Sequence, residues 1–177
     1  MRPLSTILLL LFSLTVAAQK FSLEKSSVSF FSDETVEDIV AENTKTAAIF
    51  NISTGEVVFS IPIKDFEFDK SLMKEHFNEK YMESEKFPKA TFQGALSGFQ
   101  KEIQGPQNSK AKGKLIIHGV PREVEITGTI EFTNTQVFMK SKFNIRLEDY
   151  KIKIPQLLWQ NIAEVVEVTV DFTFKPM

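Results

Sequence analysis

Apolar and polar residues alternate along most of the chain, with the two-residue period that is typical of half-buried β-strands. In residues 56–63 every second position is apolar, and after a one-residue slip at Lys64–Asp65 the alternation resumes at Phe66 and Phe68. The slip indicates a bulge or bend. Pro62 lies on the opposite face, which indicates a strand that is bent or partly at an edge.

A hairpin is predicted for residues 114–132, with its turn at Gly119–Arg122 and apolar residues of both arms on one face. The same alternation predicts further strands, at residues 26–31, 46–52, 89–96, 137–147 and 165–174. Seven to nine strands with one wet and one dry face make an all-β sandwich or a closed barrel. The length of the chain and its dense dry face favour an antiparallel up-and-down barrel of about eight strands.

Residues 71–84 interrupt this pattern with a helical one. Asp69 or Ser71 can cap the start of a short helix, and Phe87–Pro88 requires that it end earlier, because the residue before a proline avoids the α region. A single helix among strands is expected to cover one end or side of the barrel. Its apolar stripe recurs every four residues: Met73, Phe77 and Tyr81, with Leu72 and His76 beside them.

The first eighteen residues have the organisation of a secretory signal peptide. Arg2 gives a basic start, residues 7–16 are almost wholly apolar, and the small residues Ala17 and Ala18 resemble a cleavage site. The apolar run is too short to span a bilayer comfortably. We therefore expect residues 1–18 to be removed and residues 19–177 to form a single exported domain, with no stable membrane insertion. A membrane anchor is the competing interpretation.

Composition points to an unusually apolar interior. The chain has 17 phenylalanines against two tyrosines and one tryptophan, and phenylalanine brings no polar group into a core. An ordinary packed core explains this, and so does an interior lined for an apolar guest. The net charge of −2 is spread along the chain without a basic block, so nucleic acid is not an expected partner.

Several kinds of catalytic chemistry lack their usual residues. The chain has no cysteine, which removes disulfides, thiolate catalysis and cysteine-ligated metals. It has no G-x-S-x-G motif, and the only histidines, His76 and His118, do not have metal-ligand spacing. We expect no catalytic residue, no metal and no cofactor.

Three blocks resemble one family of bacterial periplasmic proteins. They are HFNEKYMESEKFPKATF (76–92), GKLIIHGVPREVEI (113–126) and IAEVVEVTVDF (162–172), in that order. Together they resemble the YceI-like family, over about residues 21–174, and the first block is similar to the form found in Bacteroidetes. The acidic segment 32–41 departs from the commoner family pattern and looks like a loop or short helix.

This resemblance implies a lipocalin-like barrel around a long apolar cavity, in which family members bind polyisoprenoids or other lipid-like molecules. The expected function is therefore a periplasmic carrier of a long apolar molecule, without catalysis. Burying about 500 Å² of such a chain is worth roughly 12 kcal/mol, much of it offset by lost freedom. A charged headgroup is expected at the mouth, near Arg122 or Lys89.

Twelve inward residues are candidates for lining such a cavity, with plain core packing as the competing account for each: Phe59, Ile61, Phe68, Phe77, Tyr81, Phe92, Ile117, Ile126, Met139, Phe143, Val170 and Phe172. One alternative function is an envelope or stress-linked interaction domain with a filled barrel and an exposed apolar patch at Phe31, Phe138 or Trp159. Another is a lipid-modifying enzyme, for which Tyr81 and His76 are the available polar side chains. The pattern of charges allows a monomer or a dimer.

Overall fold

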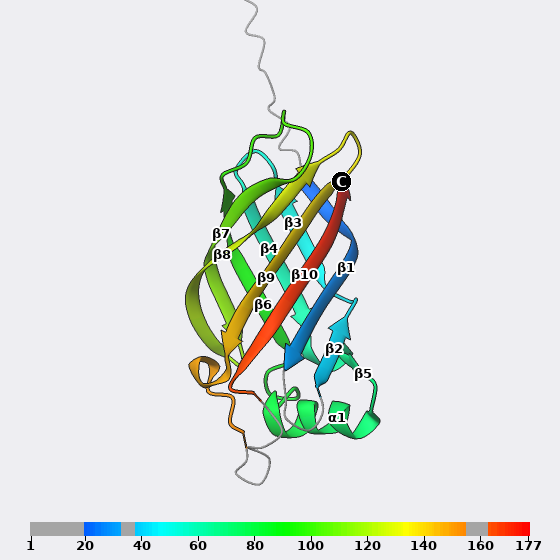
Figure 1. Ribbon diagram of the computed structural model, residues 1–177, viewed down its shortest axis with the longest axis vertical. Helices are drawn as coiled ribbons and strands as arrows, with labels where there is room; N and C mark the ends of the chain where they lie inside the picture. Colours follow the sequence, from blue (N-terminus) through cyan, green and yellow to red (C-terminus); the bar gives the residue numbers. More distant parts are fainter. Residues whose placement is uncertain (1–19, 33–37, 155–162) are drawn as a thin grey trace, which may run out of the picture.

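The computed structural model describes residues 20–32, 38–154 and 163–177. Their strands form one antiparallel sheet that closes on itself, because β1 pairs with β10 along nearly its whole length (Figure 1). The strands are β1 (Lys20–Ser32), β2 (Ile39–Asn43), β3 (Ala47–Asn51), β4 (Glu56–Pro62), β5 (Glu67–Phe68), β6 (Lys89–Ser97), β7 (Gln107–Ile117), β8 (Val120–Phe132), β9 (Val137–Arg146) and β10 (Val165–Pro176).

These ten strands occupy eight positions around the barrel. β2 and β3 share one position, because they pair with the two ends of β1, and β4 and β5 share the next. The prediction of an all-β antiparallel barrel of about eight strands is therefore confirmed. Helix α1 (Ser71–His76) lies across the end of the barrel opposite the C-terminus (Figure 1).

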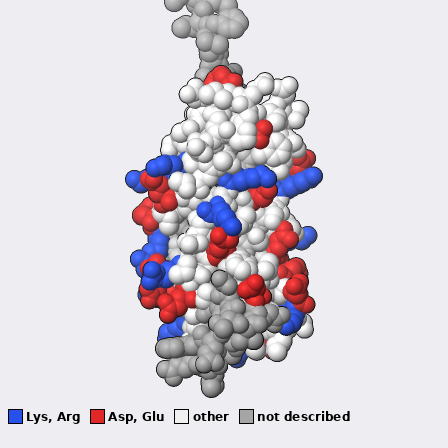
Figure 2. All heavy atoms as spheres, in the orientation of Figure 1, with Lys and Arg blue, Asp and Glu red and all other residues white. Residues whose placement is uncertain are grey.

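Alternation places apolar residues inside and charges outside, as the pattern predicts. On the face seen in Figure 2, positive and negative side chains are intermixed, and no single sign dominates. Cross-strand ion pairs join neighbouring strands of the barrel: Lys140–Asp171 (2.8 Å) and Lys142–Glu167 (2.7 Å) link β9 to β10. Exposed pairs of this kind contribute little stability each, so the interior must supply most of it.

The slip after β4 is not a bulge. Residues Ile63–Asp65 form a short 3-10 helix, η1, which separates β4 from β5. β4 pairs with β6 over Glu56–Pro62 but with β3 only over Val57–Ser60, so its last two residues pair on one side and the prediction of a strand partly at an edge is confirmed there. Pro62 is tolerated because it is the last residue of the strand, beyond the pairing with β3.

The turn of the β7–β8 hairpin lies at His118–Gly119, earlier than the predicted Gly119–Arg122, since Ile117 pairs with Val120. Both turn residues have positive φ, 51° and 71°, as the commonest two-residue hairpin turns require. A Cβ at Gly119 would lie 2.5 Å from the ring of Phe87. Glycine is therefore required here by both the backbone and its neighbour.

The acidic segment 32–41 was expected to be a loop or short helix. Within its described part, residues from Ile39 onward belong to strand β2, and residues 33–37 lie outside the described ranges. The strand forms because Ile39, Ala41 and Asn43 alternate inward against β1.

The helix covers a shorter range than residues 71–84. α1 continues directly into a π-helical turn, η2 (Phe77–Tyr81), which the amide of Met82 closes by donating to the Phe77 carbonyl at 2.8 Å. Neither predicted cap is used, because Lys70 takes the N-cap position without a side-chain hydrogen bond. Leu72 is also not part of the buried stripe, since it is 58% exposed.

At the end of the barrel near the C-terminus, the interior is filled by phenylalanine rings. We call these the terminal Phe cluster: Phe21, Phe50, Phe99, Phe132 and Phe174. Phe50 lies at its centre, with ring centroids 6.4, 6.1 and 6.2 Å from those of Phe21, Phe99 and Phe174. The contacts between these rings pack this end of the barrel.

Candidate functional site

Two cavities lie inside the described part of the barrel. The larger, about 340 Å³, lies under helix α1 at the end opposite the terminal Phe cluster, and we call it the helix-end cavity. The smaller, about 70 Å³, lies in the middle of the barrel, and we call it the mid-barrel cavity. The larger volume is within the range of small-molecule sites in proteins. The interior is thus filled at one end and hollow at the other.

Each of the twelve candidate lining residues lies at the wall of one or the other of these two cavities. Five line the helix-end cavity: Ile61, Phe68, Phe77, Tyr81 and Ile117. Seven line the mid-barrel cavity: Phe59, Phe92, Ile126, Met139, Phe143, Val170 and Phe172. The candidates are therefore brought together as two groups rather than as one continuous lining.

Other lining residues of the helix-end cavity were not among the candidates. Phe30 and Phe66 contribute rings, and Val28, Val166 and Val168 contribute the wall of β1 and β10. Strand alternation in residues 26–31 and 165–174 was enough to turn these positions inward. The alternation did not show at which end of the barrel these residues would line a cavity.

Helix α1 and the π turn η2 form a cover over the helix-end cavity, and aromatic contacts anchor this cover to the barrel. The ring of Phe77, on η2, stacks on Phe30 at 5.5 Å and 20°, and it packs against Phe66 and Phe68 at 5.5 and 5.0 Å. Such pairs contribute beyond their buried area. The π turn therefore holds the ring of Phe77, its first residue, between β1 and β5.

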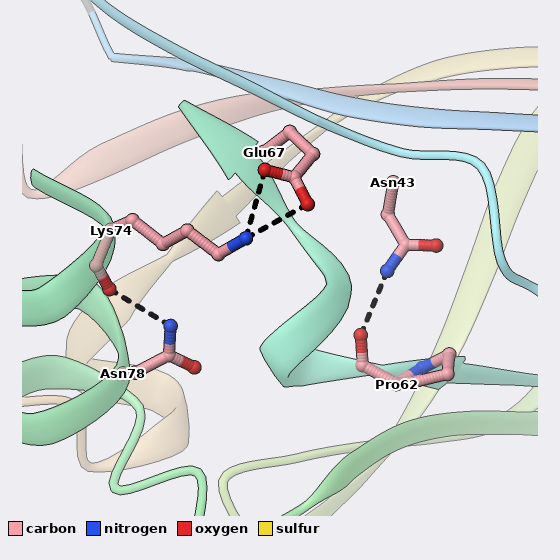
Figure 3. A network of polar contacts seen from close by, with 5 residues as sticks. All are labelled: Asn43, Pro62, Glu67, Lys74 and Asn78. Atoms are coloured by element: carbon pink, nitrogen blue, oxygen red, sulfur yellow. Dashed lines mark hydrogen bonds and ion pairs between the residues drawn. The ribbon is translucent and has the colours of Figure 1, made fainter. Parts of the chain in front are cut away.

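One polar contact joins the helix to the barrel, and a second joins two strands of the barrel (Figure 3). Lys74 on α1 donates to both carboxylate oxygens of Glu67 on β5, each at 2.8 Å. Asn43, wholly buried at the end of β2, donates to the carbonyl of Pro62 at 2.7 Å. The first contact ties α1 to β5, and the second ties the end of β2 to the end of β4.

The wall of the helix-end cavity is almost entirely apolar. Its polar side chains are Ser29, Ser32, His76 and Tyr81, and no lysine, arginine, aspartate or glutamate among the described residues lines it. Burial raises the pKa of the Tyr81 hydroxyl, so this group stays protonated and can donate a hydrogen bond. The two residues considered for an enzyme, Tyr81 and His76, thus share this cavity.

Neither residue expected near a charged headgroup lines a cavity. Arg122 donates from Nε and Nη2 to the backbone and side chain of Asp149, at 3.0 and 2.9 Å. Lys89 is exposed at the start of β6, paired with Pro62. Arg122 thereby ties the 3-10 helix η3 (Leu147–Tyr150) to the barrel, and the position of a headgroup stays a prediction.

His118 connects the cover to the hairpin turn. Its side chain is 8% exposed, with Nε2 2.9 Å from Glu83 Oε2 and Nδ1 3.2 Å from the Tyr150 carbonyl. Both partners are acceptors, so both contacts are complete when both ring nitrogens carry hydrogens. The ring of Phe87 packs against the imidazole at 4.4 Å. Glu83, at φ 43°, is held in an uncommon backbone conformation by these contacts.

Replacing Glu83 with alanine is expected to destabilise the protein by about 1–3 kcal/mol, because a buried imidazole nitrogen loses its partner. Urea denaturation followed by circular dichroism measures the loss. Glu85→Ala is the matched control in the same loop: Glu85 is exposed and pairs with Lys64 at the surface, so its loss should stay within about 0.5 kcal/mol. Equal denaturation midpoints for the two variants would show that the Glu83–His118 contact does not contribute to the free energy of unfolding.

The described part of the surface does not show the apolar patch considered for an interaction domain. Phe31 and Phe138 are half-buried, and Trp159 lies outside the described residues. Ile49 and Val58 form one exposed cross-strand pair, and other exposed apolar side chains, such as Val40, Leu72 and Ile103, lie on different elements. No described helix is both long and apolar enough to cross a bilayer.

Comparison with known proteins identifies one family and several solved structures with the same fold. A model of the YceI-like domain matches residues 19–174. A polyisoprenoid-binding domain from Saccharophagus degradans, implicated in plant cell wall breakdown, is similar in structure with a TM-score of 0.76 and 15% identity, covering 89% of this chain and 98% of that domain. A comparison with curated proteins finds no match.

Two further solved structures share the fold. BcnA of Burkholderia cenocepacia aligns with a TM-score of 0.67 and 18% identity, over 84% of this chain and 94% of its own. The YceI protein of Campylobacter jejuni aligns with a TM-score of 0.58 and 13% identity, over 82% and 88%. At these identities the likeness concerns the fold.

Proposed function

Because this chain belongs to the YceI-like domain family, we propose that it binds a long apolar molecule, an isoprenoid or another lipid, with an apolar segment inside the helix-end cavity. The observation that carries the proposal is a cavity of about 340 Å³ with an apolar wall, at the end of the barrel opposite the terminal Phe cluster. The polyisoprenoid-binding domain with the same fold supports this ligand class.

The energetics of such binding need no charged contact. Each buried methylene contributes about 0.8 kcal/mol, and the ordering of a flexible chain offsets part of the sum. Because the described wall has no carboxylate or ammonium group, the buried segment is uncharged. Tyr81 can donate one hydrogen bond to a hydroxyl or carbonyl group at the end of the ligand near the cover.

The proposed role is that of a carrier in the periplasm, without a catalytic step. The export signal expected in residues 1–18 supports this location. Tyr81 and His76 provide polar atoms in the cavity, but among the described residues no cluster of three His, Asp or Glu could hold a metal ion beside them. Binding and release of an intact ligand are therefore the activity we propose.

Titration calorimetry with farnesol, a prenyl alcohol, tests the proposal. We expect saturable binding of one molecule per chain with a negative heat-capacity change, which is the robust marker of buried apolar surface. Absence of binding, both by calorimetry and by displacement of a fluorescent apolar probe, would contradict the proposed function.

A further inference from the structure

The two cavities are separated by a boundary that can be followed from strand to strand. On each of four strands it falls between successive inward residues, of which the first lines the helix-end cavity and the second lines the mid-barrel cavity: Ile61 and Phe59 on β4, Ala90 and Phe92 on β6, Ile145 and Phe143 on β9, and Val168 and Val170 on β10. The boundary therefore crosses the barrel as a layer rather than at a single side chain.

Large side chains in register form this layer. Phe59 on β4 lies directly opposite Phe92 on β6, and Phe92 lies opposite Leu115 on β7. Leu115 is buried and lines neither cavity. The rings of Phe59 and Phe92 stack at 5.1 Å and 16°, and Phe172 from β10 packs edge-on against Phe59 at 5.8 Å. We call Phe59, Phe92, Leu115 and Phe172 the aromatic floor.

A glycine makes room for the floor. A Cβ at Gly94 would lie 2.7 Å from Cζ of Phe92, so the ring occupies the space that a side chain at position 94 would need. Phe92 is 1% exposed. Its ring is thus held in place by the backbone of its own strand and by Phe59.

The volume above the floor limits the length of an apolar chain. At about 30 Å³ per group, the share of one water molecule in the liquid and close to the size of a methylene, the 340 Å³ cavity accommodates roughly a dozen carbons. The mid-barrel cavity, about 70 Å³, would add only about two more, and the floor closes the way to it.

Building on the proposed function, we propose that the aromatic floor is a length-determining element. An uncharged apolar segment of about a dozen carbons fills the helix-end cavity, and any longer chain leaves its remainder outside the barrel. Phe59 is the specificity-determining residue, because its ring lies between those of Phe92 and Phe172.

A series of 1-alkanols from about eight to about eighteen carbons tests the proposal by calorimetry, with each methylene expected to raise affinity about fourfold while it enters the cavity. In the wild type this gain should stop at about twelve carbons. In Phe59→Ala, or in Phe59→Leu if the alanine variant does not fold, the gain should continue for at least two further carbons. Phe99→Ala is the matched control, because Phe99 belongs to the terminal Phe cluster. Its replacement should leave unchanged the chain length at which the gain in affinity stops.

The outcomes separate this inference from the proposed function. A steady gain to the longest alkanol in the wild type would overturn the floor while leaving lipid binding intact. If the gain in affinity stops at the same alkanol length in a folded Phe59 variant as in the wild type, the role of Phe59 is overturned. No binding of any alkanol by wild type or variants would contradict the proposed function, and the floor with it.

Discussion

Replacing Phe50 with alanine is expected to lower the free energy of unfolding by about 3–5 kcal/mol, the usual cost of removing a fully buried aromatic ring. Phe50 is 0% exposed, and its ring contacts three others of the terminal Phe cluster. The barrel closes around this cluster, so the strands of β1, β3 and β10 cannot collapse easily into the space that the ring leaves. A loss of this size is a large fraction of the stability of a typical domain.

Urea denaturation followed by circular dichroism measures this effect. Ile49→Ala is the matched control, because Ile49 is the preceding residue on β3 and is 49% exposed on the outer face. It should change stability by about 0.5 kcal/mol or less. Phe50 lines neither cavity, so the folded Phe50→Ala variant should bind apolar ligand with unchanged affinity. A small loss of stability together with a loss of binding would reverse the roles assigned to the two ends.

Replacing Ala90 with phenylalanine is expected to weaken ligand binding by roughly a hundredfold or more, because the new ring fills space that several methylenes of the ligand would occupy. Ala90 is buried on β6 and lines the helix-end cavity opposite Ile61. Because the ring enters an existing void, stability should stay within about 1 kcal/mol of the wild type or increase. Calorimetry with farnesol and urea denaturation measure the two quantities.

Ala95→Phe is the matched control for this variant. Ala95 lies on the same strand, exposed on the outer face and paired with Glu56 and Lys112, so its replacement should leave binding unchanged. Wild-type affinity in a folded Ala90→Phe variant would place the ligand somewhere other than the helix-end cavity. An equal loss in both variants would indicate a general disturbance of β6.

The strand faces could be predicted from the sequence because alternation has a period of two and needs no knowledge of distant contacts. Errors occurred where a distant residue decides the local structure. The hairpin turn at His118–Gly119 requires positive φ at a histidine, which His118 adopts while bonded to Glu83 and Tyr150, far away in the sequence. Glycine and proline at positions 119 and 121 favoured a later turn on local grounds alone.

The cavity could be predicted only in part. Strand alternation predicted that Phe59 and Phe92 point inward, and the helical stripe predicted the same for Phe77, but neither pattern shows whether facing side chains meet across a barrel. Phe59 on β4 and Phe172 on β10 do meet across the barrel, with ring centroids 5.8 Å apart, and together with Phe92 they form the floor between the two cavities. Phe77 instead packs at the edge of the cover, through a π turn that no sequence pattern indicated, and leaves space beneath it.

The central claim is that the barrel holds an apolar molecule at its hollow end. Native mass spectrometry of the protein purified from its own cells, followed by lipid extraction, tests this claim most directly. We predict one bound apolar molecule per wild-type chain and its loss in Ala90→Phe. Empty wild-type protein that also takes up neither farnesol nor 1-alkanols would contradict the account.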